Sequence, residues 1–416
     1  MTSFPELGAR TSTHETLLKI GIRVPTPVQT AAIPLLMQGR DCVIQSPTGS
    51  GKTLAFLIPM VERLQSHTHG EPRALIVVPT RELATQIGMV LTQLAPRLRS
   101  VLVFGGVGYD KQINQLRTAD VIIGCPGRLL DLAGRRAARL GGVEYLVLDE
   151  ADEMLDAGFA KDVEELTALT NRRTTAQRRQ TLLTSATMPE WVAQMARKHL
   201  TDPAQVAVAP NVDSDLEHGL VSVQRTEKVA VLSQLLAQSS STIVFHRTKH
   251  GAKKLAHALT ALGHRTSELQ GNLSQAARDR AIASFRRRET TVLVATNVAA
   301  RGIDIQDVSL VVNYELPDTA QWLTHRVGRT ARNGAKGRAV TFLSEDDGEK
   351  WGKLRRLGAP ELQFVDAAHL LSTGAMTFVA PRPGTASGPT APRRQAPRPG
   401  RYRTARGPVA PRSSRG

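Results

Sequence analysis

The chain has 416 residues, of which 41% are hydrophobic and 22% are charged, a composition typical of a folded protein with two or three domains. Lys and Arg number 54 and Asp and Glu 37, giving a formal net charge of +17, which favours a polyanionic partner such as nucleic acid. Two cysteines exclude a disulfide framework, and no apolar run reaches the ~20 residues of a membrane span, so we expect a cytoplasmic protein.

In the first half of the chain, short apolar runs rich in β-branched residues alternate with amphipathic stretches. Because strands that are apolar throughout are buried on both faces, this pattern predicts an α/β domain with a parallel sheet covered by helices. The helices expected include one that opens at Lys52, and others over 81–94 and 191–199. The expected strands are 42–45, 74–78, 101–104, 121–124, 145–148 and 181–184.

The alternation lapses in a polar segment and then restarts, which predicts a second α/β domain. We place the first domain at 1–208, the linker at 209–217 and the second domain at 218–365. The second domain is expected to contain helices over 253–262 and 275–286. Its expected strands are 242–245, 266–269, 292–295, 310–313 and 339–342.

The remaining segment, 366–416, is predicted to be a disordered basic tail. Residues 381–416 contain nine Arg, eight Pro, five Gly and no acid, so about half of the net charge lies there. With so few apolar groups, burial cannot offset the entropy cost of ordering this segment. Clustered arginines could tether RNA through its phosphates without sequence preference. A merely solubilising extension is the alternative.

The strand at 42–45 is followed by a glycine-rich loop that opens a helix. Glycines let backbone N–H groups face an anion beside a helix N-terminus, which predicts a phosphate-binding loop rather than a structural turn. We expect Lys52 to reach the β- and γ-phosphates of a nucleotide and the Thr53 hydroxyl to bind Mg²⁺. The loop residues that would contact the nucleotide are Ser46, Thr48, Gly49, Ser50, Gly51, Lys52 and Thr53.

A second group of polar residues follows the apolar strand at 145–148. Asp149 and Glu150 would lie at the C-terminal edge of the sheet, where ligands of open α/β sheets bind. Asp149 can hold Mg²⁺, partly through water, and Glu150 can orient or deprotonate a hydrolytic water. Alone, these acids could equally cap a helix; beside a phosphate loop, catalysis is the better interpretation. Upstream, the Gln29 amide matches the hydrogen-bonding edge of adenine, and an aromatic ring could cover the base.

These elements, with Asp149-Glu150-Ala151-Asp152 spelled out, resemble the DEAD-box ATP-dependent RNA helicases of superfamily 2, and bacterial members in particular. The resemblance runs from Phe4 to Leu343, about four-fifths of the chain. The other blocks that carry it, in chain order, are 79–84, 105–106, 126–128, 185–187, 243–245, 275–278, 295–304 and 325–332. Two departures from the family pattern are Cys125, where Thr or Ser is usual, and Asn297, where Asp is usual.

The resemblance implies two RecA-like domains with ATP in the cleft between them and RNA lying across both. It assigns adenine reading to Gln29 and stacking on the base to Phe4. Nucleotide contacts from the second domain would come from Gly302 and Asp304. The resemblance further implies arginine fingers at Arg329 and Arg332, a catalytic contribution from His325, and coupling of the phosphate site to RNA by Asp152, Ser185, Thr187 and, again, His325.

For RNA, the resemblance selects arginine, hydroxyl and glycine positions that suit phosphates and sugars rather than base edges. Such contacts carry little sequence information, and an aromatic content of 4% leaves few base-stacking platforms. The positions are Thr80, Arg81, Gly106, Gly127, Arg128, Arg278 and Thr296.

The sequence therefore predicts an RNA-stimulated, Mg²⁺-dependent ATPase that locally unwinds or remodels short RNA duplexes and RNA–protein complexes without processive translocation. Two alternatives remain open at this point. One is an RNA-binding clamp or annealing chaperone dominated by the basic tail, and the other is a motor directed at DNA.

Overall fold

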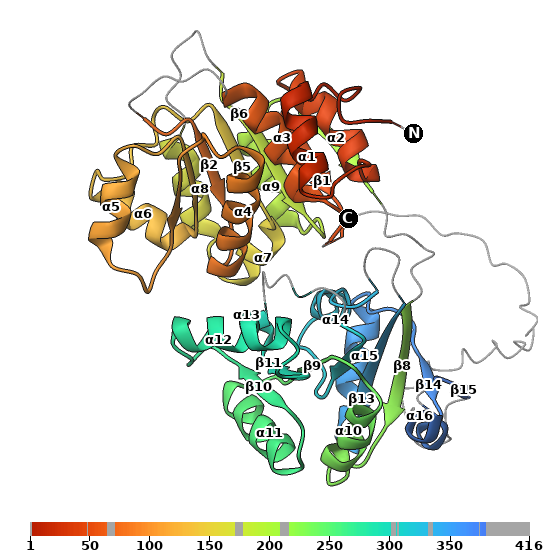
Figure 1. The fold of residues 1–416 in the computed structure, drawn as a ribbon. Coiled ribbons are helices and arrows are strands. Elements are labelled where there is room, and N and C mark those ends of the chain that lie inside the picture. Colours follow the sequence, from red (N-terminus) through yellow and green to blue (C-terminus); the bar gives the residue numbers. More distant parts are fainter. Residues whose placement is uncertain are drawn as a thin grey trace, which may run out of the picture.

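The computed structural model describes residues 2–47, 49–64, 71–170, 178–208, 216–300, 305, 308–331, 336–373 and 375–379. Two lobes follow one another along the chain, each built on one sheet with helices packed against it (Figure 1). The sheets share no strand. The two α/β domains predicted from the alternating pattern are thereby confirmed.

The sheet of the first domain has the strand order β3-β4-β2-β5-β6-β1-β7 in the described part of the chain, and its paired strands all run parallel. This order brings the ends of β1, β5 and β6 side by side at the centre of one sheet edge. The strands are β1 (Cys42–Gln45), β2 (Ala74–Val77), β3 (Ser100–Val103), β4 (Val121–Gly124), β5 (Tyr145–Leu148), β6 (Gln180–Ser185) and β7 (Ala204–Ala207).

Helices cover both faces of this sheet, because alternate residues of its central strands enter two separate hydrophobic clusters. Tyr145 and Val147 of β5 belong to one cluster, whereas Leu146 and Leu148 belong to the other. The helices are α1 (Thr11–Lys19), α2 (Pro27–Met37), α3 (Lys52–Leu64), α4 (Arg81–Leu94), α5 (Tyr109–Leu116), α6 (Pro126–Gly134), α7 (Ala151–Asp156), α8 (Ala160–Leu169) and α9 (Glu190–His199).

The sheet of the second domain has the order β10-β11-β9-β12-β13-β8-β14-β15 among the described residues, with only the β14–β15 pair antiparallel. Its strands are β8 (Leu216–Ser222), β9 (Thr242–Phe245), β10 (Thr266–Leu269), β11 (Val292–Ala295), β12 (Leu310–Asn313), β13 (Gly337–Leu343), β14 (Gln363–Val365) and β15 (Phe378–Val379). Its helices are α10 (Lys228–Ala237), α11 (Lys249–Ala261), α12 (Gln275–Arg286), α13 (Asn297–Ala300), α14 (Ala320–Val327), the 3₁₀ turn η1 (Glu345–Asp347), α15 (Gly348–Arg356) and α16 (Ala367–Thr373).

The predicted domain limits need two corrections. The linker expected at 209–217 ends earlier, because β8 begins at Leu216 and pairs with β13. The segment expected to be a tail from residue 366 starts with folded elements: α16 packs on the second domain with Leu370 only 1% exposed, and β15 pairs with β14. Residues 366–379 lack the Pro and Arg enrichment of the rest of the predicted tail, and residues 380–416 lie outside the described residues.

In the described part of the chain, none of the helices combines the length and apolar composition that a membrane span requires.

Candidate functional site

The loop between β1 and α3 depends on glycine at two positions. Gly49 and Gly51 have φ angles of +86° and +98°, which L-residues with side chains rarely adopt. A Cβ on Gly51 would also lie 2.6 Å from Gln29 Nε2 and 2.8 Å from Thr26 Oγ1. Ser46 Oγ donates to Ser50 Oγ at 2.5 Å across the loop. The loop therefore curls tightly before the N-terminus of α3, as phosphate binding requires.

Lys52, the first residue of α3, is folded against this loop. Its side chain is 6% exposed, and Nζ donates to the carbonyl oxygens of Ser46 at 2.7 Å and Pro47 at 3.4 Å. A phosphate in the loop would offer the ammonium an anion in place of two neutral carbonyls. Thr53 follows it in the first turn of α3, and Thr48 lies outside the described residues.

Gln29 is held by both ends of its amide, one at the start of α2 and the other at this loop. Oε1 accepts from Thr26 N at 3.0 Å, within a capping box that starts α2, and Nε2 donates to Gly51 O at 3.1 Å. Each amide end keeps one further hydrogen-bonding position. Gln29 therefore links the start of α2 to the phosphate loop, and its reading of adenine stays a prediction.

Phe4 does not fit the role expected for it. Its ring is 0% exposed and lies inside the hydrophobic core of the first domain, tilted against His14 with ring centroids 6.5 Å apart. A ring enclosed on all sides has no face to offer to a base. The expected stacking of Phe4 on adenine is wrong for this conformation, because burial of the ring stabilises the N-terminal segment instead.

The two acids after β5 share a buried threonine as partner. Thr184 Oγ1 of β6 donates to Asp149 Oδ1 and accepts from the backbone N–H of Glu150 at 3.2 Å. Asp149 is 3% exposed. Burial, with a smaller contribution from the neighbouring Glu150 charge, raises the pKa of Asp149 to about 6, against the opposing effects of Thr184 and Lys52.

Glu150 has features of a group prepared for a ligand. Its φ of +53° lies in the left-handed region, which is strained for a residue with a side chain. The side chain is 7% exposed, and Oε2 is buried without a hydrogen-bond partner among the described residues. The donor set of one threonine hydroxyl and one carboxylate, from Thr53 and Asp149, fits Mg²⁺, which takes few protein ligands alongside substrate phosphates and water.

Asp152 connects α7 to the segment after β6 and to the second domain. Thr187 donates to Asp152 Oδ2 from both its backbone N, at 2.9 Å, and its hydroxyl, at 2.8 Å. Ser185 Oγ donates to the carbonyl of Thr187. From α14 of the second domain, Gln321 Nε2 donates to Thr187 Oγ1 at 2.6 Å and to Asp152 Oδ2 at 3.3 Å. Two of the residues expected to couple the phosphate site to RNA, Asp152 and Thr187, thus contact the second domain through Gln321, and their coupling role stays a prediction.

One turn after Gln321, His325 faces the same acids at longer range. Its Nε2 lies 3.9 Å from Asp152 Oδ2 and its Nδ1 lies 3.9 Å from Glu153 Oε1. The ring is 9% exposed, and within the described part of the chain neither ring nitrogen makes a hydrogen bond. Burial lowers the pKa of His325 despite the nearby carboxylates, so the ring is neutral at pH 7.

The predicted arginine fingers lie at and beyond the end of α14. Arg329, two residues after the helix, is 5% exposed, and its positive charge opposes protonation of His325. The neighbouring Arg326 is fixed in the core of its own domain, where Nε donates to Asn297 Oδ1 at 2.7 Å and Nη1 to Asn313 Oδ1 at 3.1 Å. The expected nucleotide contacts Gly302 and Asp304, and the second finger, Arg332, lie outside the described residues.

Two of the positions expected to bind RNA, Arg81 and Arg278, make contacts between the domains. Arg81 lies against Gly106, where a Cβ would collide with the guanidinium, and its Nη1 donates to Gln275 Oε1 at 3.2 Å. Arg278 donates from Nε and Nη2 to Glu82 Oε1 at 2.9 and 2.7 Å. Both arginines thus join α4 to α12.

The remaining positions expected to bind RNA lie in loops and at the starts of helices. Arg128 donates to Val107 O at 2.9 Å and covers the Tyr109 ring at 4.2 Å from its centroid. Thr80 caps α4 by accepting from Leu83 N. Gly127 precedes Arg128 in α6, and Thr296, 5% exposed, directly precedes α13. RNA binding by these residues stays a prediction.

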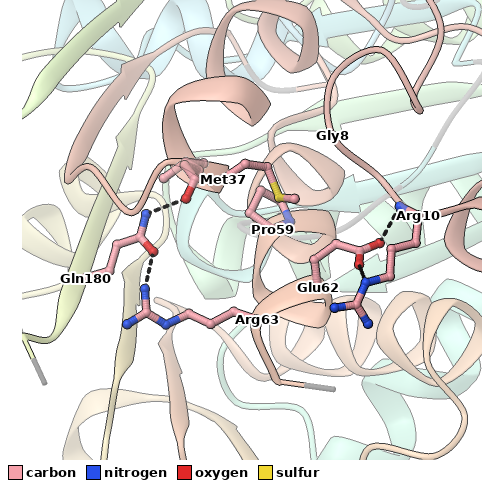
Figure 2. Close-up of a pocket in the computed structure, with 8 residues that line it drawn as sticks. Gly8, Arg10, Met37, Pro59, Glu62, Arg63 and Gln180 are labelled. Atoms are coloured by element: carbon pink, nitrogen blue, oxygen red, sulfur yellow. Dashed lines mark hydrogen bonds and ion pairs between the residues drawn. The ribbon is translucent and has the colours of Figure 1, made fainter. Parts of the chain in front are cut away.

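A cavity of about 230 Å³ in the first domain lies away from this site (Figure 2). It adjoins the C-terminal half of α3 and the first residue of β6, at the sheet edge opposite the phosphate loop. Glu62 accepts from Arg10 and Thr13, and Gln180 bridges Arg63 to backbone carbonyls. Its lining residues are Gly8, Arg10, Leu36, Met37, Pro59, Glu62, Arg63 and Gln180. These mutual contacts tie the N-terminal segment to α3 and β6.

Sequence reasoning missed two residues that contact the predicted site, Thr184 and Gln321. Thr184 is a hydroxyl residue at the end of an apolar strand, next to the strand that carries the acids, and that position was a usable signal. Gln321 lies four residues before His325, which places both on one face of α14. Its contact with Thr187 depends on how the domains meet, which no local pattern reveals.

Comparison with known proteins supports the interpretation of these elements. The family model described as DEAD/DEAH box helicase matches residues 26–195, and the model described as helicase conserved C-terminal domain matches residues 227–334. Both matches fall within the two α/β domains.

Among curated relatives, RNA helicase CrhR of the bacterium Synechocystis sp. is 39% identical over 354 residues, covering 83% of this chain and 70% of that protein. The chloroplastic DEAD-box ATP-dependent RNA helicase 3A of Zea mays is 39% identical over 384 residues, covering 86% of this chain. The chain spans about half the length of that maize protein, 51%.

Among solved structures, S. cerevisiae Dbp5 bound to RNA and ADP BeF3 is 32% identical. It matches with a TM-score of 0.77 over 89% of this chain and 97% of that chain.

Proposed function

Because the chain belongs to the DEAD-box ATP-dependent RNA helicases, we propose that it is an RNA-stimulated ATPase that locally separates short RNA duplexes and remodels RNA–protein complexes without processive translocation. One observation carries the proposal: Gln321 on α14 of the second domain donates to both Asp152 and Thr187, and Asp152 lies two residues after Glu150 of the phosphate site. Groups divided between two domains make hydrolysis conditional on closure.

In the proposed reaction, the first domain supplies binding and proton transfer. The loop N–H groups and Lys52 hold the β- and γ-phosphates, while Thr53 and Asp149 are the residues that would hold Mg²⁺. The ion, when bound, neutralises charge on the phosphate oxygens. Glu150 orients the water whose oxygen attacks the γ-phosphorus and accepts the proton that this water loses, as the bond to the β-phosphate oxygen breaks.

The second domain supplies a positive charge that stabilises the reacting phosphate only when the two domains meet. Arg329 would place its guanidinium against the negative charge that develops on the γ-phosphate. RNA bound across α4 and α12 favours the arrangement in which the domains meet, and a ligand that favours one state raises every activity that this state carries. RNA is therefore expected to stimulate hydrolysis, and one strand bent on closure would leave its partner strand.

The test is steady-state ATP hydrolysis by the full chain without nucleic acid, with RNA and with matched DNA, each at two salt concentrations, because electrostatic affinity depends on salt. We expect stimulation by RNA and little by DNA, together with loss of turnover in Glu150→Gln at retained nucleotide binding. Equal stimulation by DNA would indicate a DNA-directed motor. Normal turnover of Glu150→Gln would contradict the proposed role of Glu150.

The strongly basic composition of residues 381–416 favours one second candidate, an RNA clamp or annealing chaperone in which this segment carries the function. Deleting residues 381–416 separates the two. The helicase proposal predicts surviving RNA-stimulated hydrolysis with weaker RNA affinity, whereas the clamp predicts loss of RNA binding with no effect on hydrolysis. A cytoplasmic location is part of the proposal, to be tested by cell fractionation.

A further inference from the structure

Thr184 lies beside the catalytic acids because of the register between β5 and β6. These strands run parallel with Leu148 opposite Leu183, so the next residues on each strand, Asp149 and Thr184, are also neighbours. Leu182 and Leu183 are apolar and fully buried, and Thr184 is itself 0% exposed. A hydroxyl at the end of such a strand needs hydrogen-bond partners, because an unpaired buried hydroxyl is costly.

Both partners of this hydroxyl belong to the acid pair. Oγ1 donates its one proton to Asp149 Oδ1 and accepts the backbone N–H of Glu150 at 3.2 Å. A hydroxyl can do both at once, whereas a methyl group of the same size can do neither. The side chain of Thr184 thus contacts the carboxylate of one acid and the backbone of the other.

The contact with Glu150 matters because of the backbone conformation of that residue. Its φ of +53° is unfavourable for a residue with a side chain, and such conformations persist only where the surroundings hold them. A hydrogen bond from the Glu150 N–H to Thr184 fixes the peptide plane that leads into this conformation. It thereby sets the direction in which the Glu150 carboxylate leaves the chain.

We propose that Thr184 is a positioning residue for ATP hydrolysis, which holds the Asp149 carboxylate and the Glu150 backbone in the geometry that the reaction needs; this inference rests on the proposed function of those acids. Thr184 acts through the two acids, which provide both partners of its hydroxyl. Loss of its hydroxyl should slow turnover while leaving the phosphate loop, and so ATP binding, in place.

The experiment compares three variants of the full chain by RNA-stimulated hydrolysis. Thr184→Val keeps the shape and removes the hydroxyl, and it should lower kcat by about 10–100-fold, the usual effect of losing a group that orients a metal-binding carboxylate. The KM for ATP should change by less than about threefold, as for an interaction made mainly in the transition state. Thr184→Ser restores the hydroxyl and should recover most of kcat.

Thr181→Val is the matched control. Thr181 lies at the other end of β6, is 1% exposed, and accepts from Arg179 Nε at 3.0 Å. Thr181→Val removes a buried hydroxyl from the same strand without removing a contact to Asp149 or Glu150, so kcat should stay close to wild type. Equal losses of kcat in Thr181→Val and Thr184→Val would show a general effect of strand stability and overturn the proposal.

Two further measurements keep the result decisive. The thermal unfolding midpoint shows whether Thr184→Val folds, and the affinity for a fluorescent ATP analogue shows whether it binds nucleotide. If Thr184→Val does not fold, the Thr184→Ser variant decides. Wild-type stability and kcat in Thr184→Ser support the role of the hydroxyl, whereas wild-type stability with a much reduced kcat overturns it. In single-turnover experiments, adding Thr184→Val to Glu150→Gln should cost little more than Glu150→Gln alone, because residues that act as a unit are not additive. Full additivity would overturn the proposal.

Failure of the proposed function is distinguishable from failure of this inference. A wild-type chain without RNA-stimulated hydrolysis contradicts the proposed function. An active wild type with unchanged kcat in Thr184→Val contradicts only the role of Thr184.

Discussion

The acid-bearing edge of the first domain and the facing end of α14 in the second hold their polar side chains in different ways. Asp149 and Asp152 each accept hydrogen bonds from threonines of their own domain. His325, by contrast, has its nearest carboxylate oxygens at 3.9 Å and, among the described residues, no hydrogen bond from its ring. The first domain therefore positions Asp149 and Asp152 mainly through its own threonines, whereas Gln321 and His325 of the second domain face groups across the interface.

Arg326 and Arg329 sharpen this comparison within the second domain. Arg326 is 1% exposed and donates to two asparagine side chains and a backbone carbonyl, so it stabilises its own domain. Arg329 follows the helix and is the arginine that the proposed mechanism brings to the phosphates. The two arginines, three positions apart, should give opposite patterns of stability and rate when they are replaced.

The largest effect is expected for Arg329→Ala. Loss of an arginine finger lowers kcat by about 10³–10⁵-fold, while nucleotide affinity should change little because the loop and Lys52 bind the phosphates. Hydrolysis at saturating RNA and binding of a fluorescent nucleotide measure the two quantities. As the paired control, Arg326→Met should lower the unfolding midpoint. A large loss of ATP affinity with unchanged kcat in Arg329→Ala would contradict the finger.

An intermediate effect is expected from pH on the Mg²⁺ requirement. Burial, helped by the Glu150 charge, raises the pKa of Asp149 to about 6, so below this pH the carboxyl binds a proton that competes with the ion. The Mg²⁺ concentration for half-maximal nucleotide binding should rise about tenfold from pH 7.5 to pH 5. Glu150→Gln removes the neighbouring charge and should move this dependence to lower pH. A constant requirement down to pH 5 would contradict the raised pKa.

A smaller effect should follow from breaking the contact between the domains. Gln321→Ala removes the two hydrogen bonds to Asp152 and Thr187, worth about 1 kcal/mol, or roughly fivefold, in favour of the closed arrangement. The ratio of RNA-stimulated to basal hydrolysis should fall by about this factor. Gln194→Ala on the exposed side of α9 is the control and should leave the ratio unchanged. An unaltered ratio in Gln321→Ala would show that this contact does not favour closure.

The smallest effect concerns stability alone. Asn297 Oδ1 accepts from Arg326 Nε at 2.7 Å, and burial lowers the pKa of Arg326 to about 9. Asn297→Asp would place a negative charge beside the buried Arg326 guanidinium and raise the pKa of Arg326. We expect the second domain to gain about 1 kcal/mol, measured as a rise of about 2–4 °C in the unfolding midpoint. A lower midpoint would mean that desolvation of the new carboxylate outweighs the pairing.

Sequence patterns predict the central strands well because those strands are short, apolar and largely buried; β1, β4, β5, β9, β11 and β12 have the expected limits. The edge strand β10 also has the expected limits, although it is mostly polar and only half-buried. The strands that were missed are β7, β8, β14 and β15, and three of them are short or only partly buried. β7 alternates buried and exposed residues over only four positions, and β14 and β15 have three and two residues. Such strands are stabilised by pairing with a neighbour and carry little local signal.

The predicted site divides in the same way. The loop glycines and acids follow from local chemistry, so their placement at one sheet edge could be foreseen. The burial of Phe4 could not be predicted, because an aromatic residue that packs in the core and one that covers a base look alike in a sequence. The contacts of Arg81 with Gln275 and of Arg278 with Glu82 join segments almost two hundred residues apart, and only the folded chain shows them.

The capping box that joins Thr26 and Gln29 offers a reporter of nucleotide occupancy. In this structure the Thr26 amide proton is shielded from solvent deuterium by Gln29 Oε1. A purine that draws the Gln29 side chain away would release that proton to exchange, while one that leaves Oε1 in place would slow its exchange further by ordering the loop. The deuterium uptake of a single peptide at the start of α2 would thus distinguish a base that rearranges this glutamine from one that only completes its hydrogen bonds.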